Sequence, residues 1–347
     1  MAEKRILLDM TLFELQACFA ELGEPRFRAE QVFGWLHKGA TFDEMKNVPS
    51  ALRRALGESF FDQPVTLSQA FPSQRDDTVK LLCGLHDGNV VEGVLMRYHY
   101  GYSLCISTQV GCRMGCAFCA STLDGCVRSL SAGEMLGEAL VADRYLGDKG
   151  RVGHIVLMGS GEPLDNYDNT VRFLRLINDE KGLNISLRNI SVSTCGLVPQ
   201  IDRFAQEGLS VTLSISLHAP NDDIRRQLMP VAKTYSIAEL MGSARAYVQK
   251  TGRRIVFEYA LIDKLNSLPE HARELSALLR GLQCHVNLIP LNHVKERSLA
   301  PASPQAVQTF LKTLEERHIS ATVRREMGGD VSGACGQLRR SYLQSEQ

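Results

Sequence analysis

The spacing of hydrophobic residues changes twice along the 347-residue chain. In the first sixty residues, apolar side chains recur every three to four positions, as at Leu12, Leu15 and Phe19. That spacing places them on one face of an amphipathic helix, and the segment 26–39 repeats it. The sequence therefore predicts a small helical module over residues 1–60.

A second pattern, in which apolar and polar residues alternate, occupies much of residues 61–104. Alternation with a period of two places the apolar side chains on one face of a β-strand. The tetrapeptide His-Asp-Gly-Asn at 86–89 interrupts the alternation, and its Asp-Gly step favours a tight hairpin turn. We expect a β-hairpin or small sheet here, as an extension that leads into the rest of the chain.

From residue 105 onward, apolar runs of strand length alternate with amphipathic runs of helix length. This order implies βα units and a parallel sheet. The predicted strands are 104–108, 154–159, 189–196, 211–219, 254–262, 285–292 and, as a possible last member, 320–326. About six strands are too few for the eight-stranded closed TIM barrel. We therefore expect an α/β fold, with an open partial (βα)6-type barrel over 105–347 and a groove wide enough for a macromolecule.

Small and polar residues gather where these predicted strands end. They are Gly161 and Glu162, Ser193 and Thr194, Ser216 and His218 on either side of Leu217, then Glu258 and Asn292. In βα barrels the carboxyl ends of the strands build the active site. Scattered loop residues would not be expected to recur at the ends of five strands. The sequence thus predicts one site at that end of the barrel.

Composition and charge narrow the class of protein. Lys and Arg total 39, as do Asp and Glu, so any RNA contact must come from local patches. No apolar run approaches the ~20 residues of a membrane span, and the N-terminus lacks the apolar core of a signal peptide. We expect a soluble cytoplasmic protein without membrane contact. In a reducing compartment, ten cysteines indicate metal binding or catalysis rather than disulfides.

Three of these cysteines lie in the stretch GCRMGCAFCAST, residues 111–122. Cys112, Cys116 and Cys119 offer soft thiolates, which suit zinc or an iron–sulfur cluster. A [4Fe–4S] cluster normally takes four cysteines, so three leave one iron able to chelate S-adenosylmethionine and cleave it reductively to a radical. Structural zinc needs a fourth ligand, which Cys126 could supply. A zinc-stabilised RNA-binding protein without catalysis therefore stays open as an alternative.

The strand ends are suited to hold S-adenosylmethionine beside such a cluster. The Glu162 carboxylate can accept hydrogen bonds from the methionine amino group, and Gly161 allows close backbone approach. The segment 216–218, together with Ser193 and Asn292, can hold the carboxylate, ribose and adenine. The sequence predicts these as the cosubstrate-binding residues.

Several motifs together resemble one family of radical enzymes. GCRMGCAFCAST, MGSGEPLDN, VSTCG, SISLHAPND, VNLIPLN and ACGQL occur in the order found in the RlmN family, and the resemblance spans residues 5–343. That family implies a dual-specificity methyltransferase acting on C2 of adenine, at adenine 2503 of 23S rRNA and adenine 37 of certain tRNAs. The sister Cfr family methylates C8 of the rRNA adenine and usually has alanine in place of Pro163. Pro163 therefore favours the C2 enzyme, with a C8 enzyme as the alternative.

The resemblance also implies roles for three residues outside the cysteine stretch. Cys335 matches the family's methyl-carrying cysteine, Cys105 its partner, and Glu92 the proton acceptor. One S-adenosylmethionine would methylate Cys335, and a second would give the radical that activates the S-methyl group for addition to C2. Cys105 would then attack Cys335, releasing methylated RNA and leaving a disulfide. A thiolate is needed as methyl acceptor because C2, between two ring nitrogens, is electron-poor.

The same scheme implies the partners of the protein. They are 23S rRNA and tRNA, a flavodoxin-like electron donor and a thiol reductant, with the enzyme as a monomer. RNA contacts are expected from residues 1–60, as an RNA-binding accessory module, and from Arg113, Arg128, Arg324, Arg325, Arg339 and Arg340. The remaining cysteines, Cys195 among them, and Met158 are predicted to be core residues.

Overall fold

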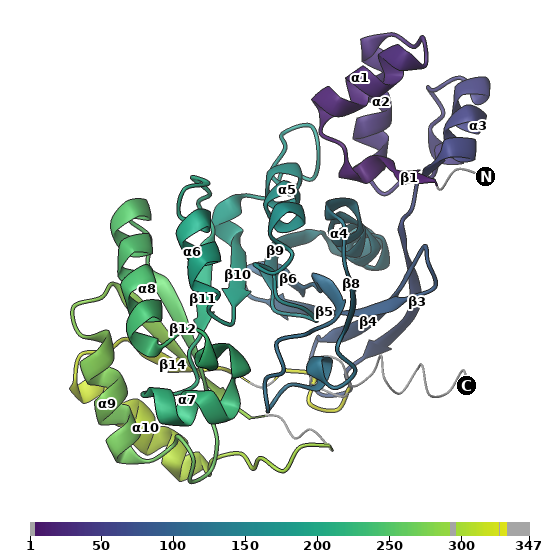
Figure 1. The fold of residues 1–347 in the computed structure, drawn as a ribbon. Helices are drawn as coiled ribbons and strands as arrows, with labels where there is room; N and C mark the ends of the chain where they lie inside the picture. The colour runs from purple at the N-terminus through teal and green to yellow at the C-terminus, as the bar shows by residue number, and fades with distance from the viewer. Residues whose placement is uncertain (1–3, 292–295, 326, 332–347) are drawn as a thin grey trace.

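The N-terminal part of the chain is helical, as the apolar spacing predicts (Figure 1). The computed structural model describes residues 4–291, 296–325 and 327–331. Its first elements are β1 (Arg5–Ile6), α1 (Leu12–Glu21), α2 (Arg26–Leu36), α3 (Ser50–Ser59) and β2 (Phe60–Phe61). Because β1 and β2 pair in parallel, the two ends of this helical segment lie side by side.

Three antiparallel strands follow the helices. They are β3 (Val65–Pro72), β4 (Val79–Leu85) and β5 (Val90–Tyr98). The turn between β4 and β5 lies at the predicted position, and the Leu85 N–H donates to the Asn89 carbonyl across it (2.7 Å). Strand β5 also pairs in antiparallel fashion with β6 (Gly101–Cys105), so the extension continues directly into the main sheet.

Seven parallel strands complete a single ten-stranded sheet (Figure 1). They lie in chain order as β6, β9 (Val152–Leu157), β10 (Ile190–Thr194), β11 (Thr212–Ser216), β12 (Ile255–Leu261), β13 (Cys284–Pro290) and β14 (Ala321–Val323). Within the described ranges, the two edge strands β3 and β14 are not paired with each other, so the sheet does not close and the barrel is open. The predicted partial barrel is confirmed, and segment 320–326 does contribute its last strand.

Seven helices accompany the parallel strands. They are α4 (Ala132–Leu146), α5 (Tyr167–Ile177), α6 (Val198–Phe204), α7 (Asp222–Leu228), α8 (Ile237–Thr251), α9 (Pro269–Leu279) and α10 (Pro304–Glu316). In the part of the chain that the structure describes, no helix is both long enough and apolar enough to cross a membrane.

The two faces of the parallel sheet differ in polarity. Paired residues on neighbouring strands point to the same face, and successive residues alternate. One set is apolar and fully buried: Ile155, Leu157, Val192, Leu213, Ile215 and Phe257. The other set carries Ser193, Ser214, Ser216, Glu258 and Asn287, with Ser193 opposite Ser214 and Glu258 between Ser216 and Asn287. Parallel sheets are commonly apolar on both faces, so the polar set identifies the face that lines a site.

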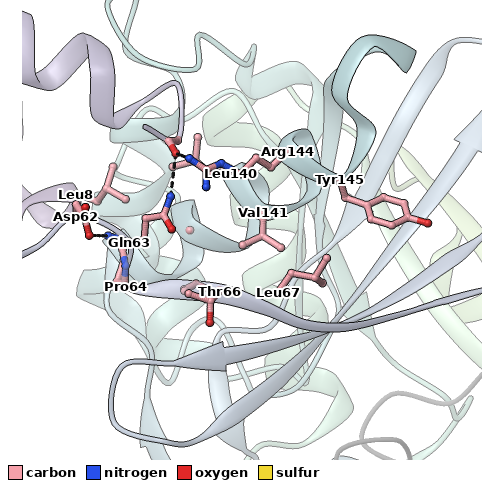
Figure 2. A pocket seen from close by; sticks show the side chains of 13 residues that line it. Leu8, Asp62, Gln63, Pro64, Thr66, Leu67, Leu140, Val141, Arg144 and Tyr145 are labelled. Carbon is pink, nitrogen blue, oxygen red and sulfur yellow. Dashed lines mark hydrogen bonds between the residues drawn. The ribbon is translucent and has the colours of Figure 1, made fainter. Parts of the chain in front are cut away.

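Helix α4 connects the N-terminal helices to the sheet. A Cβ atom at Gly137 would lie 2.6 Å from a Val65 methyl carbon, so the helix approaches β3 closely. A cavity of about 320 Å³ lies beside α4 at this seam. Figure 2 shows the side chains of Gln63 and Arg144 reaching the same backbone group, the carbonyl of Gly39. These contacts fix the N-terminal helices against the sheet.

The described end of the chain returns to the β3–β4 turn. The Asp330 carboxylate accepts hydrogen bonds from the Ser73 hydroxyl (2.6 Å) and from the next backbone N–H (2.7 Å). The Gly328 N–H donates to the Asp76 carboxylate (3.0 Å). These residues are 252 to 257 positions apart in sequence. The chain is thus attached to the first hairpin five residues before Cys335, which lies outside the described residues.

Candidate active site

A cavity of about 220 Å³ lies at the carboxyl ends of the parallel strands. It brings together most of the residues that the sequence predicts for the cluster and the cosubstrate: Cys112, Cys116, Cys119, Gly161, Glu162, Ser193, Ser216 and His218. These residues come from the cysteine loop and from the ends of three different strands. Asn292, the remaining strand-end residue predicted to bind the cosubstrate, lies outside the described residues.

A two-stranded ribbon, β7 (Gln109–Gly111) with β8 (Cys126–Ser129), carries the cysteine loop. The Cys112 N–H donates to the Gly125 carbonyl (2.8 Å) across the ribbon, and Gly111 adopts a φ of +81° there. Farther along the loop, the Thr122 hydroxyl donates to the carbonyls of Cys116 (3.3 Å) and Cys119 (3.0 Å). These bonds hold the loop backbone while its thiols line the cavity.

The chemistry of the three thiols fits a cationic, thiophilic group. Burial raises the pKa of the Cys112 thiol to about 12 and also raises that of Cys116, so a positive partner is needed to stabilise the thiolates. Among the described residues, no three His, Cys, Asp or Glu side chains form a group that could hold one metal ion. Thiolates on a cluster bind separate irons and need not converge on one point. The loop therefore fits an iron–sulfur cluster better than one zinc ion.

The loop after β9 places Glu162 at the cavity with little freedom. Its two carboxylate oxygens accept hydrogen bonds from the backbone N–H groups of Cys195 (2.7 Å) and Leu164 (3.0 Å). Burial raises the Glu162 pKa, and these backbone bonds oppose that effect. Gly161 has a φ of +110°, and a Cβ atom there would lie 2.7 Å from the backbone nitrogen of Gln109. Only glycine fits this approach, which explains the glycine before the glutamate.

His218 is held as a neutral ring. Burial lowers its pKa to about 3, and Arg225 acts in the same direction. The Ala260 N–H donates to its Nδ1 atom (2.9 Å), so the ring proton is on Nε2. The ring packs edge-on against Phe118 of the cysteine loop, with centroids 4.7 Å apart. Leu217 is fully buried and its N–H donates to the Glu258 carbonyl (3.1 Å), which connects the end of β11 to β12.

Arg225 is a site-supporting residue that the sequence does not reveal. It is fully buried in α7 and donates to the carbonyls of Cys195 (2.8 Å), Leu217 (3.3 Å) and Ser216 (3.4 Å). It therefore ties the ends of β10 and β11 together behind the cavity. In the sequence it is one of two arginines in a short charged helix, a pattern typical of a solvated surface.

Glu92 and Cys105 lie on adjacent strands, and neither lines the 220 Å³ cavity. Cys105 is paired with Val94, two residues from Glu92, so all three side chains point to the same face of the sheet. Both Glu92 and Cys105 are buried. The Lys80 ammonium lies 2.8 Å from Glu92 Oε2, a buried partner that the alternating pattern of β4 does not predict.

Met158, which the sequence predicts for the core, lies only partly buried at the site, because it follows the last residue of β9 and so passes from the sheet to its carboxyl edge. Cys195 follows β10 in the same way and lines the cavity, and it is buried in an apolar cluster as predicted. Arg128 makes ion pairs with Glu134 (2.7 Å) and Asp87 (2.6 Å), so its guanidinium has partners within the protein. Its contact with RNA stays a prediction.

Comparison with known proteins shows the family of this chain. The model of the radical SAM superfamily matches residues 106–275, and that of the ribosomal RNA large subunit methyltransferase N-terminal domain matches residues 6–61. A probable dual-specificity RNA methyltransferase RlmN of Clostridium perfringens (strain 13 / Type A) is 52% identical over 342 residues, 98% of each chain. Its counterpart in Alkaliphilus oremlandii (strain OhILAs) is 53% identical over 344 residues, 99% of this chain and 100% of the relative.

A solved structure agrees with these sequence relatives. The crystal structure of a radical SAM methyltransferase from Sphaerobacter thermophilus superposes with a TM-score of 0.93 at 43% identity. The match covers 96% of this chain and 98% of that one. Sequence and structure agree over nearly the whole length, and the chain belongs to the RlmN family of dual-specificity radical SAM RNA methyltransferases.

Proposed function

We propose that this enzyme methylates C2 of adenine in 23S rRNA and in certain tRNAs. The observation that carries the proposal is the single cavity in which three cysteines of one loop meet the polar ends of the parallel strands. Cys112, Cys116 and Cys119 would hold a [4Fe–4S] cluster. When bound, that cluster would supply the electron and the open coordination site that convert S-adenosylmethionine into a radical source.

The chain's own residues would bind and orient the cosubstrate. Glu162, held by two backbone N–H groups, presents its carboxylate to the methionine amino group. Gly161 keeps the backbone close enough for that contact. Neutral His218 offers its Nε2 proton as a hydrogen-bond donor, and Ser193 and Ser216 offer hydroxyl groups from the neighbouring strands.

Three residues would carry the group transfer. The Cys335 thiolate takes a methyl group from a first S-adenosylmethionine, because C2 of adenine is too electron-poor to do so itself. After hydrogen is removed from the S-methyl group, its carbon forms a bond to C2 and links the protein to RNA. The adduct then loses one electron, to the oxidised cluster, and its C2 proton, which Glu92 accepts. Cys105 attacks the Cys335 sulfur and forms a disulfide; the carbon–sulfur bond breaks, and the released carbon takes up a proton to become the methyl group of the RNA. A thiol reductant and a flavodoxin-like electron donor would restore the enzyme.

The order of these steps gives the test. Cys335→Ala should stop the reaction before any bond to RNA forms, whereas Cys105→Ala should stop it with RNA still attached. The measurement is a denaturing gel probed for protein-linked RNA, with Cys284→Ala as a control for loss of a half-buried thiol in β13. Methylation by Cys335→Ala, or normal turnover by Cys105→Ala, would contradict the scheme. Mass spectrometry of the methylated nucleoside separates C2 from C8 chemistry.

Residues 1–60 would act as an accessory module that contacts RNA. Arg28 and Arg53 in its helices are examples of cations available for phosphate, although each also donates to a backbone carbonyl of the module. Deleting residues 1–60 should weaken tRNA binding and flatten its salt dependence while sparing S-adenosylmethionine cleavage. Unchanged affinity with an unchanged salt slope would assign the module another role.

A further inference from the structure

A buried ion pair outside the cavity joins Glu92 to a lysine that has no role in the steps above. Lys80 in β4 and Glu92 in β5 lie 2.8 Å apart, with side-chain exposures of 2% and 3%. Residues flanking Lys80 in β4 are mostly apolar and buried, as expected for a strand within the sheet. A charged pair in such a place is unusual, because lysine and glutamate are rarely buried unless paired.

Stability alone gives no reason for this pair. Moving two charges out of water costs several kcal/mol per ion, and well-packed apolar residues in place of a buried ion pair are often equally or more stabilising. Leu82, two residues after Lys80 on β4, shows that an apolar side chain packs well on the same face. A chemical role is therefore the better explanation for the pair.

The sheet register places the pair beside the cysteine proposed to resolve the adduct. Lys80 is opposite Val94, and Val94 is opposite Cys105, so these residues form one row across three strands. Glu92 belongs to the next row on the same face, opposite Leu82. Neighbouring strands are about 4.8 Å apart, so the ammonium, the carboxylate and the thiol share one small region of the sheet.

The backbone at Glu92 is connected to the cosubstrate loop. The Ser107 hydroxyl donates to the Glu92 carbonyl (3.0 Å) and accepts from the Ser160 N–H (3.0 Å). Ser160 directly precedes Gly161 and Glu162, which line the cavity. Glu92 is therefore held at its carboxylate by the Lys80 ammonium and at its backbone carbonyl by the Ser107 hydroxyl.

We propose that Lys80 is a positioning residue for proton removal from the target adenine. Its ammonium binds the Glu92 carboxylate in a site with little water and fixes the direction in which it accepts. In the step itself the C2–H bond breaks, its electron pair stays on the adenine ring, and the proton forms a carboxylic acid at Glu92. Lys80 keeps its charge and its own protons throughout. The inference rests on the proposed function of Glu92 and extends it.

The test separates adduct formation from adduct resolution. Holoenzyme is mixed with RNA that carries protium or deuterium at C2 of the target adenine, and protein-linked RNA is followed over one turnover. Lys80→Met should form the adduct at the wild-type rate but resolve it roughly tenfold or more slowly, because general bases typically contribute 10²- to 10⁴-fold. A C2 deuterium isotope effect should then appear on resolution, and Lys80→Arg should restore most of the rate.

Controls make every outcome decisive. Leu81→Met, a volume-conserving change on the other face of β4, should leave both rates unchanged. Lys80→Gln also removes the charge but keeps a polar side chain. It is used in place of Lys80→Met if that variant does not fold. Equal slowing of formation and resolution, or resolution at the wild-type rate without an isotope effect, would overturn the inference. A wild-type enzyme that forms no adduct would instead refute the proposed function and remove the basis for the role of Lys80.

Discussion

Gly111, directly before Cys112, offers a quantitative test of how the cysteine loop is held. Its φ of +81° lies in the left-handed region, and a Cβ atom there would lie 2.1 Å from the Gly125 carbonyl oxygen. Real Cβ atoms essentially never approach closer than 3.0 Å, so Gly111→Ala must open the ribbon by about 1 Å. That movement breaks the 2.8 Å hydrogen bond from the Cys112 N–H to the same carbonyl.

The expected cost has two parts. A left-handed alanine costs roughly 1–2 kcal/mol, and the lost hydrogen bond about 0.5–1.5 kcal/mol. Gly125→Ala is the matched control, because its φ of +70° brings the same backbone strain while its Cβ atom meets nothing within 4 Å. The two variants should therefore differ by about 1 kcal/mol or more.

Amide hydrogen exchange of the Cys112 N–H measures this difference directly. In the apoprotein, exchange should be one to two orders of magnitude faster in Gly111→Ala than in the wild type, and less accelerated in Gly125→Ala. Iron and sulfide content after anaerobic reconstitution should fall in the same order. Equal exchange and equal iron content in the two variants would refute the view that the ribbon sets the position of the loop.

Four further outcomes are expected. Cys116→Ala should abolish cluster assembly and methylation, because each of the three thiols lines the cavity; full iron and sulfide content would contradict this. Arg225→Met leaves three carbonyls without their donor and should weaken S-adenosylmethionine binding by roughly tenfold or more in equilibrium dialysis, at unchanged circular dichroism. Burial lowers the pKa of His37 to about 4, so the unfolded chain takes up this proton first and stability falls as pH drops from about 6.5 to 4. The unfolding free energy of His37→Phe minus that of the wild type, from urea titrations, should thus be about 2 kcal/mol larger at pH 5 than at pH 8. A difference that does not change with pH would assign the effect elsewhere. Asp330→Ala should slow methyl transfer to Cys335, followed by mass spectrometry, while S-adenosylmethionine cleavage continues; an unchanged rate would mean that the attachment to the first hairpin is dispensable.

The sequence predicts those features that depend on local patterns. Helical spacing and strand-length apolar runs predict the βα order, and polar residues after apolar runs predict the carboxyl-end site. The cysteine loop is identified by spacing alone. Each of these signals lies within a few residues of the element it describes, so no knowledge of the tertiary pairing is needed.

Features that depend on pairing between distant segments cannot be predicted from such local patterns. Lys80 resembles an exposed residue of a hairpin until β5 and β6 pair beyond it and enclose its side chain. Arg225 and Arg128 resemble surface charges until the fold brings carbonyls and carboxylates to them. Met158 continues an apolar strand in sequence, yet the strand ends one residue earlier and the side chain meets the cavity. Cys335 and Asn292 lie outside the described residues, and their roles stay predictions.

The order of strands in the sheet has a consequence for how the protein forms during synthesis. From β3 to β14, every strand is hydrogen-bonded to the one before it in the sheet, so each can join the growing edge as it leaves the ribosome. The attachment of Asp330 to the β3–β4 turn is different, since it spans 257 residues and can form only after residue 330 has been translated. A product that ends near residue 320 would possess nearly the whole sheet but neither β14 nor that attachment. Such a fragment would contain the cysteine loop but lack Cys335, so the proposed mechanism separates assembly of the site from the onset of activity.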